Sequence, residues 1–224
     1  MGYLALMPHY LFYIVPIAAA FPFLASLTIL FQPPSQRYLI YFSIFLFINC
    51  MMDTATNMSA VKNVNNIFFN NLVQMFVMAF HLYLLRAIVK SNKAKKVFLY
   101  SLLAYLLLSL LNFFLVQKTE IFNTITVSLG SLLIVSGCIY YFWELFQQRF
   151  FVNLVRQPAF WIASGLLFYY AVSFPLQSLL NFIHDFSNTT LQNLFIIFIL
   201  LNIFLYLSFT IAFLCRLKTR KSMS

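Results

Sequence analysis

Hydrophobic residues form long runs along this chain, and short polar segments separate them. A run of about 20 apolar residues is long enough to cross a membrane as a helix. The sequence therefore predicts an all-α membrane protein, in which residues 1–224 form a single bundle of seven membrane-spanning helices. The expected helices cover residues 10–31, 38–53, 67–90, 97–116, 123–143, 159–180 and 194–214.

The helix predicted over residues 67–90 has the most informative polar pattern. At 3.6 residues per turn, Asn70, Gln74 and His81 lie along one stripe. The opposite end carries Arg86 and is followed by a dense group of lysines. One end of this helix is therefore rich in uncharged amides, and the other end is basic.

Charge gives the bundle an orientation. Only 8% of the 224 residues are charged, whereas a soluble domain carries about 25%. All of the 14 Lys and Arg except Lys62 and Lys118 fall on one side of the predicted helices. The positive-inside rule then places the N-terminus outside and the C-terminus in the cytoplasm. Because the cations lie at helix ends, we expect the net charge of +10 to be attracted to the lipid bilayer. We expect no nucleic acid partner.

Strongly polar residues gather in the half of the bundle predicted to be external. An amide that faces lipid loses its hydrogen bonds, so these side chains are expected to face the interior. They could bond to one another across helices, or they could line a pocket. A lining of amides with one carboxylate would suit a small neutral or cationic ligand. The candidate ligand-binding residues are Asn49, Asp53, Asn70, Gln74, Gln177, Asn181 and Asn202.

Three residues of the internal half are candidates for a switch or for contact with a cytoplasmic partner: His81, Arg86 and Glu144. Arg86 and Glu144 end two predicted helices and are expected to pair across the bundle. His81 could be a packed, hydrogen-bonded residue or a proton relay. We expect Phe80, Tyr140 and Phe168 to close the pocket on its cytoplasmic side.

Catalytic patterns are missing from the sequence. The three cysteines are far apart and have no zinc or redox spacing. The three histidines are scattered, and no nucleophile is placed beside a base. We therefore expect no enzyme activity, no cofactor and no metal site. The last predicted helix also lacks the lysine that a retinal protein needs.

The segment Pro158–Pro175 reads PAFWIASGLLFYYAVSFP. Its motif, Pro158-x-Phe160-Trp161-Ile162-x-Ser164-Gly165-Leu166, resembles a segment of small, uncharacterised seven-helix proteins of Bacteroidetes-type bacteria. Those proteins are often considered membrane partners of sensor histidine kinases, and the likeness extends to chain length and helix layout. The resemblance implies a bacterial cytoplasmic (inner) membrane. It also implies a histidine kinase or another signalling partner, because this chain has no kinase domain of its own.

These observations predict a receptor-like sensor subunit. A ligand would enter from outside, shift the helices predicted at 67–90 and 159–180, and change cytoplasmic loops that a partner reads. A small-molecule transporter or channel-like protein could use the same cavity, although the sequence shows neither a repeat nor paired charges within the membrane. A structural assembly subunit is the third possibility.

Overall fold

A computed structural model describes residues 11–31, 36–62, 66–116, 122–147, 153–178 and 187–221. Within these ranges all regular elements are helical. Seven of the described helices are long and apolar enough to cross a membrane. The model therefore confirms the all-helical class and indicates an integral membrane protein.

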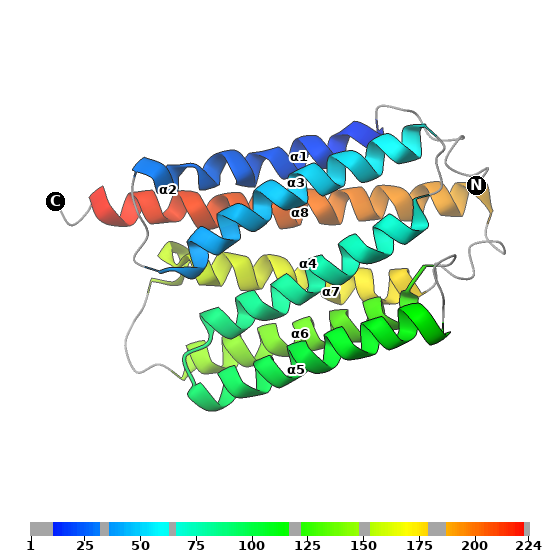
Figure 1. Ribbon diagram of the computed structural model, residues 1–224. Coiled ribbons are helices and arrows are strands. Elements are labelled where there is room, and N and C mark those ends of the chain that lie inside the picture. Colours follow the sequence, from blue (N-terminus) through cyan, green and yellow to red (C-terminus); the bar gives the residue numbers. More distant parts are fainter. Residues whose placement is uncertain are drawn as a thin grey trace.

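The helices run up and down one bundle (Figure 1). In chain order they are α1 (Leu11–Ser26) with the short α2 (Thr28–Phe31), α3 (Tyr38–Val61), α4 (Ile67–Ile88), α5 (Asn92–Leu111) with the π-helical turn η2 (Asn112–Val116), α6 (Thr124–Phe146), the 3₁₀ turn η3 (Leu154–Arg156), α7 (Pro158–Ser178) and α8 (Asn188–Lys221).

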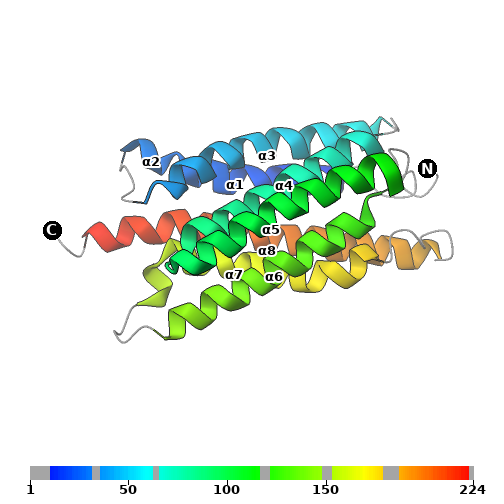
Figure 2. The ribbon, with the colours of Figure 1, turned by 60° about the horizontal axis from the view of Figure 1, so that its bottom comes forward.

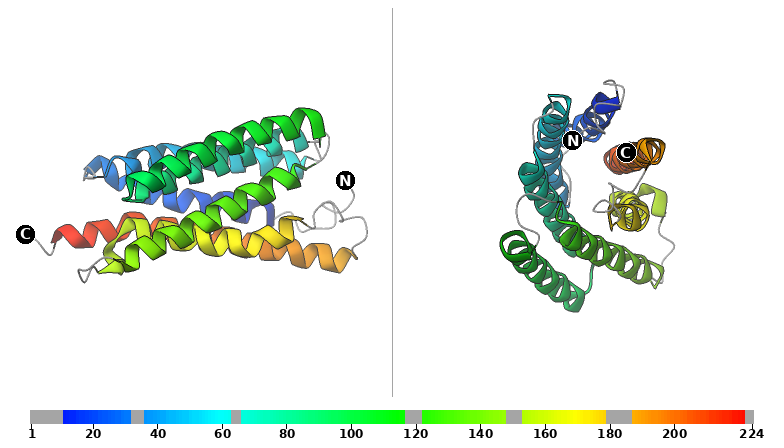
Figure 3. Two further views of the ribbon diagram at one scale, coloured as in Figure 1. Left: turned by 90° about the horizontal axis from the view of Figure 1, so that it is seen from below. Right: turned by 90° about the vertical axis from the view of Figure 1, so that its right-hand side faces the viewer.

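Six helices close a ring, and the seventh lies outside it. Going round the ring, α1 packs on α3, α3 on α4, α4 on α6, α6 on α7, α7 on α8, and α8 returns to α1. Helix α5 packs on the outer side of α4 and α6, as the end-on view in Figure 3 shows. Figure 2 shows the same bundle from a second side.

The two ends of the ring differ in chemistry. We call the end where α3 and α7 finish and α4, α6 and α8 begin the amide end, because Asn57, Asn66, Asn70, Asn71 and Asn123 lie there. We call the opposite end the basic end. Its described cations are Arg37, Arg86, Lys90, Lys93, Lys95, Lys96 and Arg156.

Helix α3 is longer than the sequence predicted. The expected range ended at residue 53 and was followed by a polar connection, but α3 continues to Val61. Thr54 Oγ1 donates to the Cys50 carbonyl at 2.8 Å, Asn57 Nδ2 to the Asp53 carbonyl at 2.7 Å, and Ser59 Oγ to the Ala55 carbonyl at 2.8 Å. Because each short polar side chain bonds one turn back, the polar segment stays helical.

The turn between α4 and α5 is also tighter than predicted. Helix α4 ends at Ile88 rather than at residue 90, and α5 begins at Asn92 rather than at residue 97. Ser91 caps α5, since its Oγ accepts a hydrogen bond from the Ala94 N–H at 3.4 Å. The lysines expected in a loop therefore belong to the first turns of α5.

Two further helices exceed their predicted ranges. Helix α6 continues to Phe146, three residues beyond the expected end, and α8 covers Asn188–Lys221 instead of 194–214. Ser187 lies immediately before α8, and its Oγ accepts from the Thr190 N–H at 3.2 Å. A polar residue in this position satisfies a donor of the first turn, so the helix begins earlier than its hydrophobic run.

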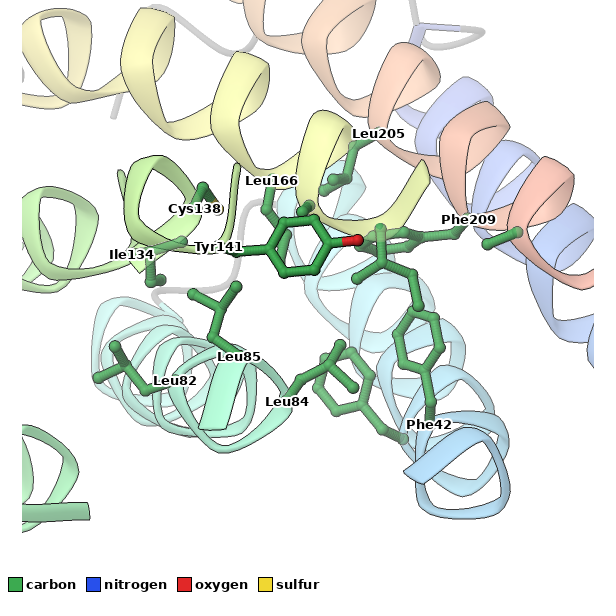
Figure 4. Close-up of a cluster of buried hydrophobic side chains, with 14 of the residues drawn as sticks. Phe42, Leu82, Leu84, Leu85, Ile134, Cys138, Tyr141, Leu166, Leu205 and Phe209 are labelled. Carbon is green, nitrogen blue, oxygen red and sulfur yellow. The ribbon is translucent and has the colours of Figure 1, made fainter. Parts of the chain in front are cut away.

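The basic half of the ring is filled by large apolar side chains. Phe42, Met78, Leu82, Leu85 and Ile134 have no measurable exposure. The Phe42 ring packs edge-on against Phe209, with 4.9 Å between the ring centroids. Figure 4 shows part of this cluster, in which Phe42 of α3, Leu82 and Leu85 of α4, Ile134 of α6, Leu166 of α7 and Phe209 of α8 converge. The outer faces of the helices carry exposed residues such as Ile17, Leu107 and Ile139, as a surface in contact with lipid requires.

Candidate functional site

A cavity of about 340 Å³ lies at the amide end of the ring. Residues from α1, α3, α4, α6, α7 and α8, together with the two residues that precede α6, form its wall. Polar and aromatic side chains dominate this wall. They are Thr56, Asn57, Asn70, Asn71, Gln74, Phe122, Asn123, Thr124, Tyr169, Gln177, Phe195, Phe198 and Asn202. We call this space the amide cavity.

A second, smaller space of about 60 Å³ adjoins the amide cavity toward the middle of the bundle. The two spaces share Gln74, Tyr169 and Asn202 as lining residues. The smaller one is also lined by Asn49, Asp53, His81, Tyr170 and Tyr206. We call it the acid chamber, because Asp53 is the only carboxylate among the described residues that line the two spaces.

The structure thus divides the predicted site residues between two adjoining spaces. Asn70, Gln74, Gln177 and Asn202 line the amide cavity. Asn49 and Asp53 line the acid chamber instead, one step deeper in the bundle. Asn181 lies outside the described residues.

Asp53 is held by a network between α3 and α8. Its Oδ2 accepts hydrogen bonds from the Tyr206 hydroxyl and from Asn49 Nδ2, the latter at 3.1 Å. Asn49 Nδ2 also lies 3.0 Å from the Tyr206 hydroxyl oxygen. Two donors therefore orient the carboxylate within the membrane-spanning region, where a carboxylate without such partners would be costly.

His81 joins α4 to α7. Its Nδ1 lies 2.8 Å from the Tyr170 hydroxyl, and the ring is only 2% exposed. The other ring nitrogen, Nε2, is buried and has no hydrogen-bond partner among the described atoms. His81 was predicted for the internal half, but it lines the acid chamber together with Asp53.

Several residues that line the two spaces were missed by the sequence reasoning. Tyr206 follows Asn202 by four residues and so lies on the same stripe of α8, which is a signal the sequence contains. Asn71 and Asn123 are both buried, and Asn71 Oδ1 accepts from the Asn123 N–H at 3.1 Å. No local sequence pattern predicts this hydrogen bond, because it joins α4 to the segment before α6.

Some polar atoms of the amide cavity are buried without a partner. Gln177 is 6% exposed, and its Oε1 makes no hydrogen bond with any described atom. Thr56 Oγ1 is also buried and makes no hydrogen bond with any described atom. Native proteins contain few such groups, and each one calls for an explanation such as a bound water or ligand.

The predicted floor of the cavity is wrong in two of its three residues. Phe168 is 47% exposed and packs against Phe204 on the outside of the bundle. Tyr140 lines a groove on the α5 side of α6 together with Lys93. Phe80 does pack inward, stacked on Phe45 with 3.9 Å between ring centroids.

The predicted pair between Arg86 and Glu144 is replaced by two other contacts. The Glu144 carboxylate accepts hydrogen bonds from the backbone N–H groups of Lys90 and Ser91, at 2.8 and 2.7 Å. Arg86 Nε donates to the Lys95 carbonyl at 3.3 Å. A turn that exposes its N–H groups before a helix attracts an anion more directly than a distant guanidinium does. The Arg86 and Glu144 side chains therefore both stabilise the α4–α5 turn.

Comparison with protein-family models, with curated proteins and with solved structures finds no match to this chain.

Proposed function

We propose that this protein is a receptor-like sensor subunit that binds a small neutral or cationic ligand in the amide cavity and signals through a separate partner. The observation that carries the proposal is the amide cavity itself, whose wall includes a buried amide oxygen without a hydrogen-bond partner among the described atoms. Unpaired amides are costly in a helix bundle unless something occupies the space beside them. A small ligand with hydrogen-bonding groups and a flat apolar body fits amides interleaved with the rings of Phe195 and Phe198.

The acid chamber supports the choice of a neutral or cationic ligand over an anion. Among the described residues that line the two spaces, Asp53 is the only acidic one, and none is a lysine or arginine. A ligand with a protonated amine would place its charge toward Asp53 while its body remains in the amide cavity. An anionic ligand would instead meet a carboxylate without any cation to offset it.

Two contacts connect the cavity to the rest of the bundle. The bond between His81 and Tyr170 joins α4 to α7, the two helices that we expect a ligand to shift. Glu144 joins the far end of α6 to the turn that follows α4. A displacement of α4 relative to α6 and α7 would therefore change the α4–α5 turn, where a partner such as a histidine kinase could read it.

The closed basic half favours a receptor over a transporter. The side chains of Phe42, Leu82 and Leu85 are fully buried beyond the acid chamber, and a transporter would have to part them in each cycle. The same proposal places the protein in a bacterial cytoplasmic membrane with the N-terminus outside. The orientation rests on the distribution of cations.

Ligand binding to the full-length protein in nanodiscs tests the proposal. The probes are a panel of small amines, amides and polyols, and the readout is the thermal shift. We expect at least one compound to stabilise the wild type, and Gln177→Leu with Gln74→Leu to abolish the shift. The matched control is Asn57→Leu at the mouth of the cavity, which should only weaken it. If the variants show the same thermal shifts with these compounds as the wild type, the proposal is contradicted.

Two further measurements separate the alternatives. Reporter fusions after Lys96 and after Asn188 should report opposite sides of the membrane, with Lys96 inside. Fusions that report the same side would overturn the orientation. Liposomes containing the protein should show no saturable uptake of a bound compound, whereas saturable flux would assign the cavity to a transporter.

A further inference from the structure

A groove of about 550 Å³ lies at the basic end, between the start of α3 and the end of α4. Three cations from three separate segments line it: Arg37 before α3, Lys90 in the α4–α5 turn and Lys95 in the first turns of α5. Tyr38, Tyr41 and Tyr83 supply aromatic walls between them. None of the described residues that line this groove is acidic. Its chemistry is therefore the opposite of that of the acid chamber.

The backbone segments that carry two of these cations, Lys90 and Lys95, are held in place by other parts of the fold. Arg86 donates to the backbone carbonyl of Lys95 at 3.3 Å, so the first turns of α5 are tied to the end of α4. Glu144 accepts from the backbone N–H of Lys90, which fixes the turn from the α6 side. Tyr41 and Tyr83 contact each other edge-on across the groove, with 6.4 Å between ring centroids. The groove is thus a built feature rather than a chance gathering of surface lysines.

The position of the groove identifies its occupant. Tyr41 is 52% exposed and Ile44, one turn further along α3, is 54% exposed, whereas Phe42 and Phe45 point into the ring. The Tyr41 wall of the groove is therefore continuous with the outer face of α3, which faces the space that lipid fills. Tyrosine rings with nearby cations are characteristic of the headgroup level of a bilayer, where basic pockets between helices bind anionic headgroups.

We propose that this groove is a binding site for an anionic phospholipid. The phosphate lies among Arg37, Lys90 and Lys95, and the upper part of an acyl chain follows the Tyr41 and Ile44 face of α3. An acidic segment of a partner protein would contact the cations but would make no use of the exposed apolar face of α3. A free phosphate shares the headgroup chemistry but makes no use of the apolar face.

Native mass spectrometry of the full-length protein tests the site. The protein is purified in detergent and titrated with dioleoyl phosphatidylglycerol or dioleoyl phosphatidylcholine, and bound lipid is counted. We expect the wild type to prefer phosphatidylglycerol. The double variant Arg37→Gln/Lys95→Gln should bind it about 20-fold more weakly, given the usual contribution of a basic residue near an anionic headgroup.

The chain offers a control with the same change in charge. Lys96 is exposed, and Lys93 lines a different groove on the α6 side of α5. Lys93→Gln/Lys96→Gln should therefore change binding by no more than about twofold, since exposed charges outside the site are screened. Equal losses in the two double variants would show diffuse attraction and overturn the site. Equal binding of the two lipids by the wild type would overturn it as well.

Two competitors distinguish the lipid from other anions. Excess inorganic phosphate should leave the bound phosphatidylglycerol in place, because phosphate lacks the acyl chain. Complete displacement by phosphate would reassign the groove to a free anion. Displacement by a glutamate-rich peptide, with no preference between the two lipids, would reassign it to a partner protein. Thermal unfolding of both double variants verifies that each is folded. None of these lipid-binding measurements depends on the proposed function of the amide cavity.

Discussion

The two halves of the ring bury their side chains in opposite ways. In the amide half, buried polar residues such as Asn71 and Gln177 surround open space, and the Gln177 oxygen has no hydrogen-bond partner in the part of the chain that the structure describes. In the basic half, side chains such as Phe42 and Leu84 are fully buried in close contact. Lipid is as apolar as the core, so contacts between well-packed side chains are a main source of helix association in a membrane. We infer that packing in the basic half holds the bundle together. The amide half is packed less tightly, which leaves the space that we propose for binding.

The largest effect should come from opening the basic half. Phe42 contacts Phe45, Phe80, Phe209 and Phe213 and has no exposure. Phe42→Ala should lower the free energy of unfolding by about 3 kcal/mol, through lost contacts and the cavity left behind. Reversible unfolding in mixed detergent micelles measures this change. Ile44→Ala, on the exposed face of the same helix, should change stability little. If both variants lose the same amount, the basic half is not the more tightly packed one.

A pair of substitutions in the amide cavity tests the other side of the comparison. Asn71 and Gln177 line the same cavity and are similarly buried. Asn71 Oδ1 accepts the Asn123 N–H, whereas Gln177 Oε1 has no partner within the described ranges. Asn71→Leu should cost about 2 kcal/mol, because it strands a buried donor. Gln177→Leu removes an unsatisfied group and should leave stability unchanged or slightly raised. A large loss in Gln177→Leu would show that this residue is structural, and the same unfolding experiment decides it.

The fold could be predicted far better than the ends of its helices. Seven apolar runs must be seven helices, because a chain in lipid has to satisfy its backbone internally. The ends depend on side chains that bond to the backbone, such as Thr54, Asn57 and Ser91. Hydropathy treats these residues only as polar, so it ended α3 too early and began α5 too late.

The site was predictable where polar residues repeat along a helix, and not elsewhere. Asn70 and Gln74, which share a stripe of α4 in the sequence, both line the amide cavity. The partner of Asp53 is Tyr206, which lies 153 positions away, and no local pattern connects them. Phe168 was misplaced because α7 is apolar on all sides. Leu166 is buried and Phe168 is exposed, yet both are large hydrophobic residues, so the pattern does not distinguish the inner face from the outer one.

A smaller effect is expected from the contact that fastens the basic end. Glu144 is half-buried and accepts two backbone N–H groups of the α4–α5 turn. Glu144→Gln leaves one acceptor oxygen and removes the charge, so it should cost about 1 kcal/mol, less than a fully buried contact would. Amide hydrogen exchange should accelerate at Lys90 and Ser91 and stay unchanged at Asn123. Gln147→Ala, at the exposed end of the same helix, is the control. Unchanged exchange at Lys90 and Ser91 would contradict a role for Glu144 in holding the turn.

The smallest effect concerns the cap of α5. Ser91 Oγ accepts the Ala94 N–H at 3.4 Å, a long hydrogen bond, so Ser91→Ala should cost about 0.5 kcal/mol, at the low end for a helix cap. Asn and Asp are ordinarily equivalent as caps, but here the Glu144 carboxylate already contacts the Ser91 N–H at 2.7 Å. A second carboxylate at position 91 would be repelled by it. We therefore expect Ser91→Asn to be close to the wild type and Ser91→Asp to be less stable than Ser91→Asn. In the Glu144→Gln background that difference should disappear, because the repelling charge is gone. If Ser91→Asp is as stable as Ser91→Asn while Glu144 is present, the carboxylate does not lie over this turn in the folded protein.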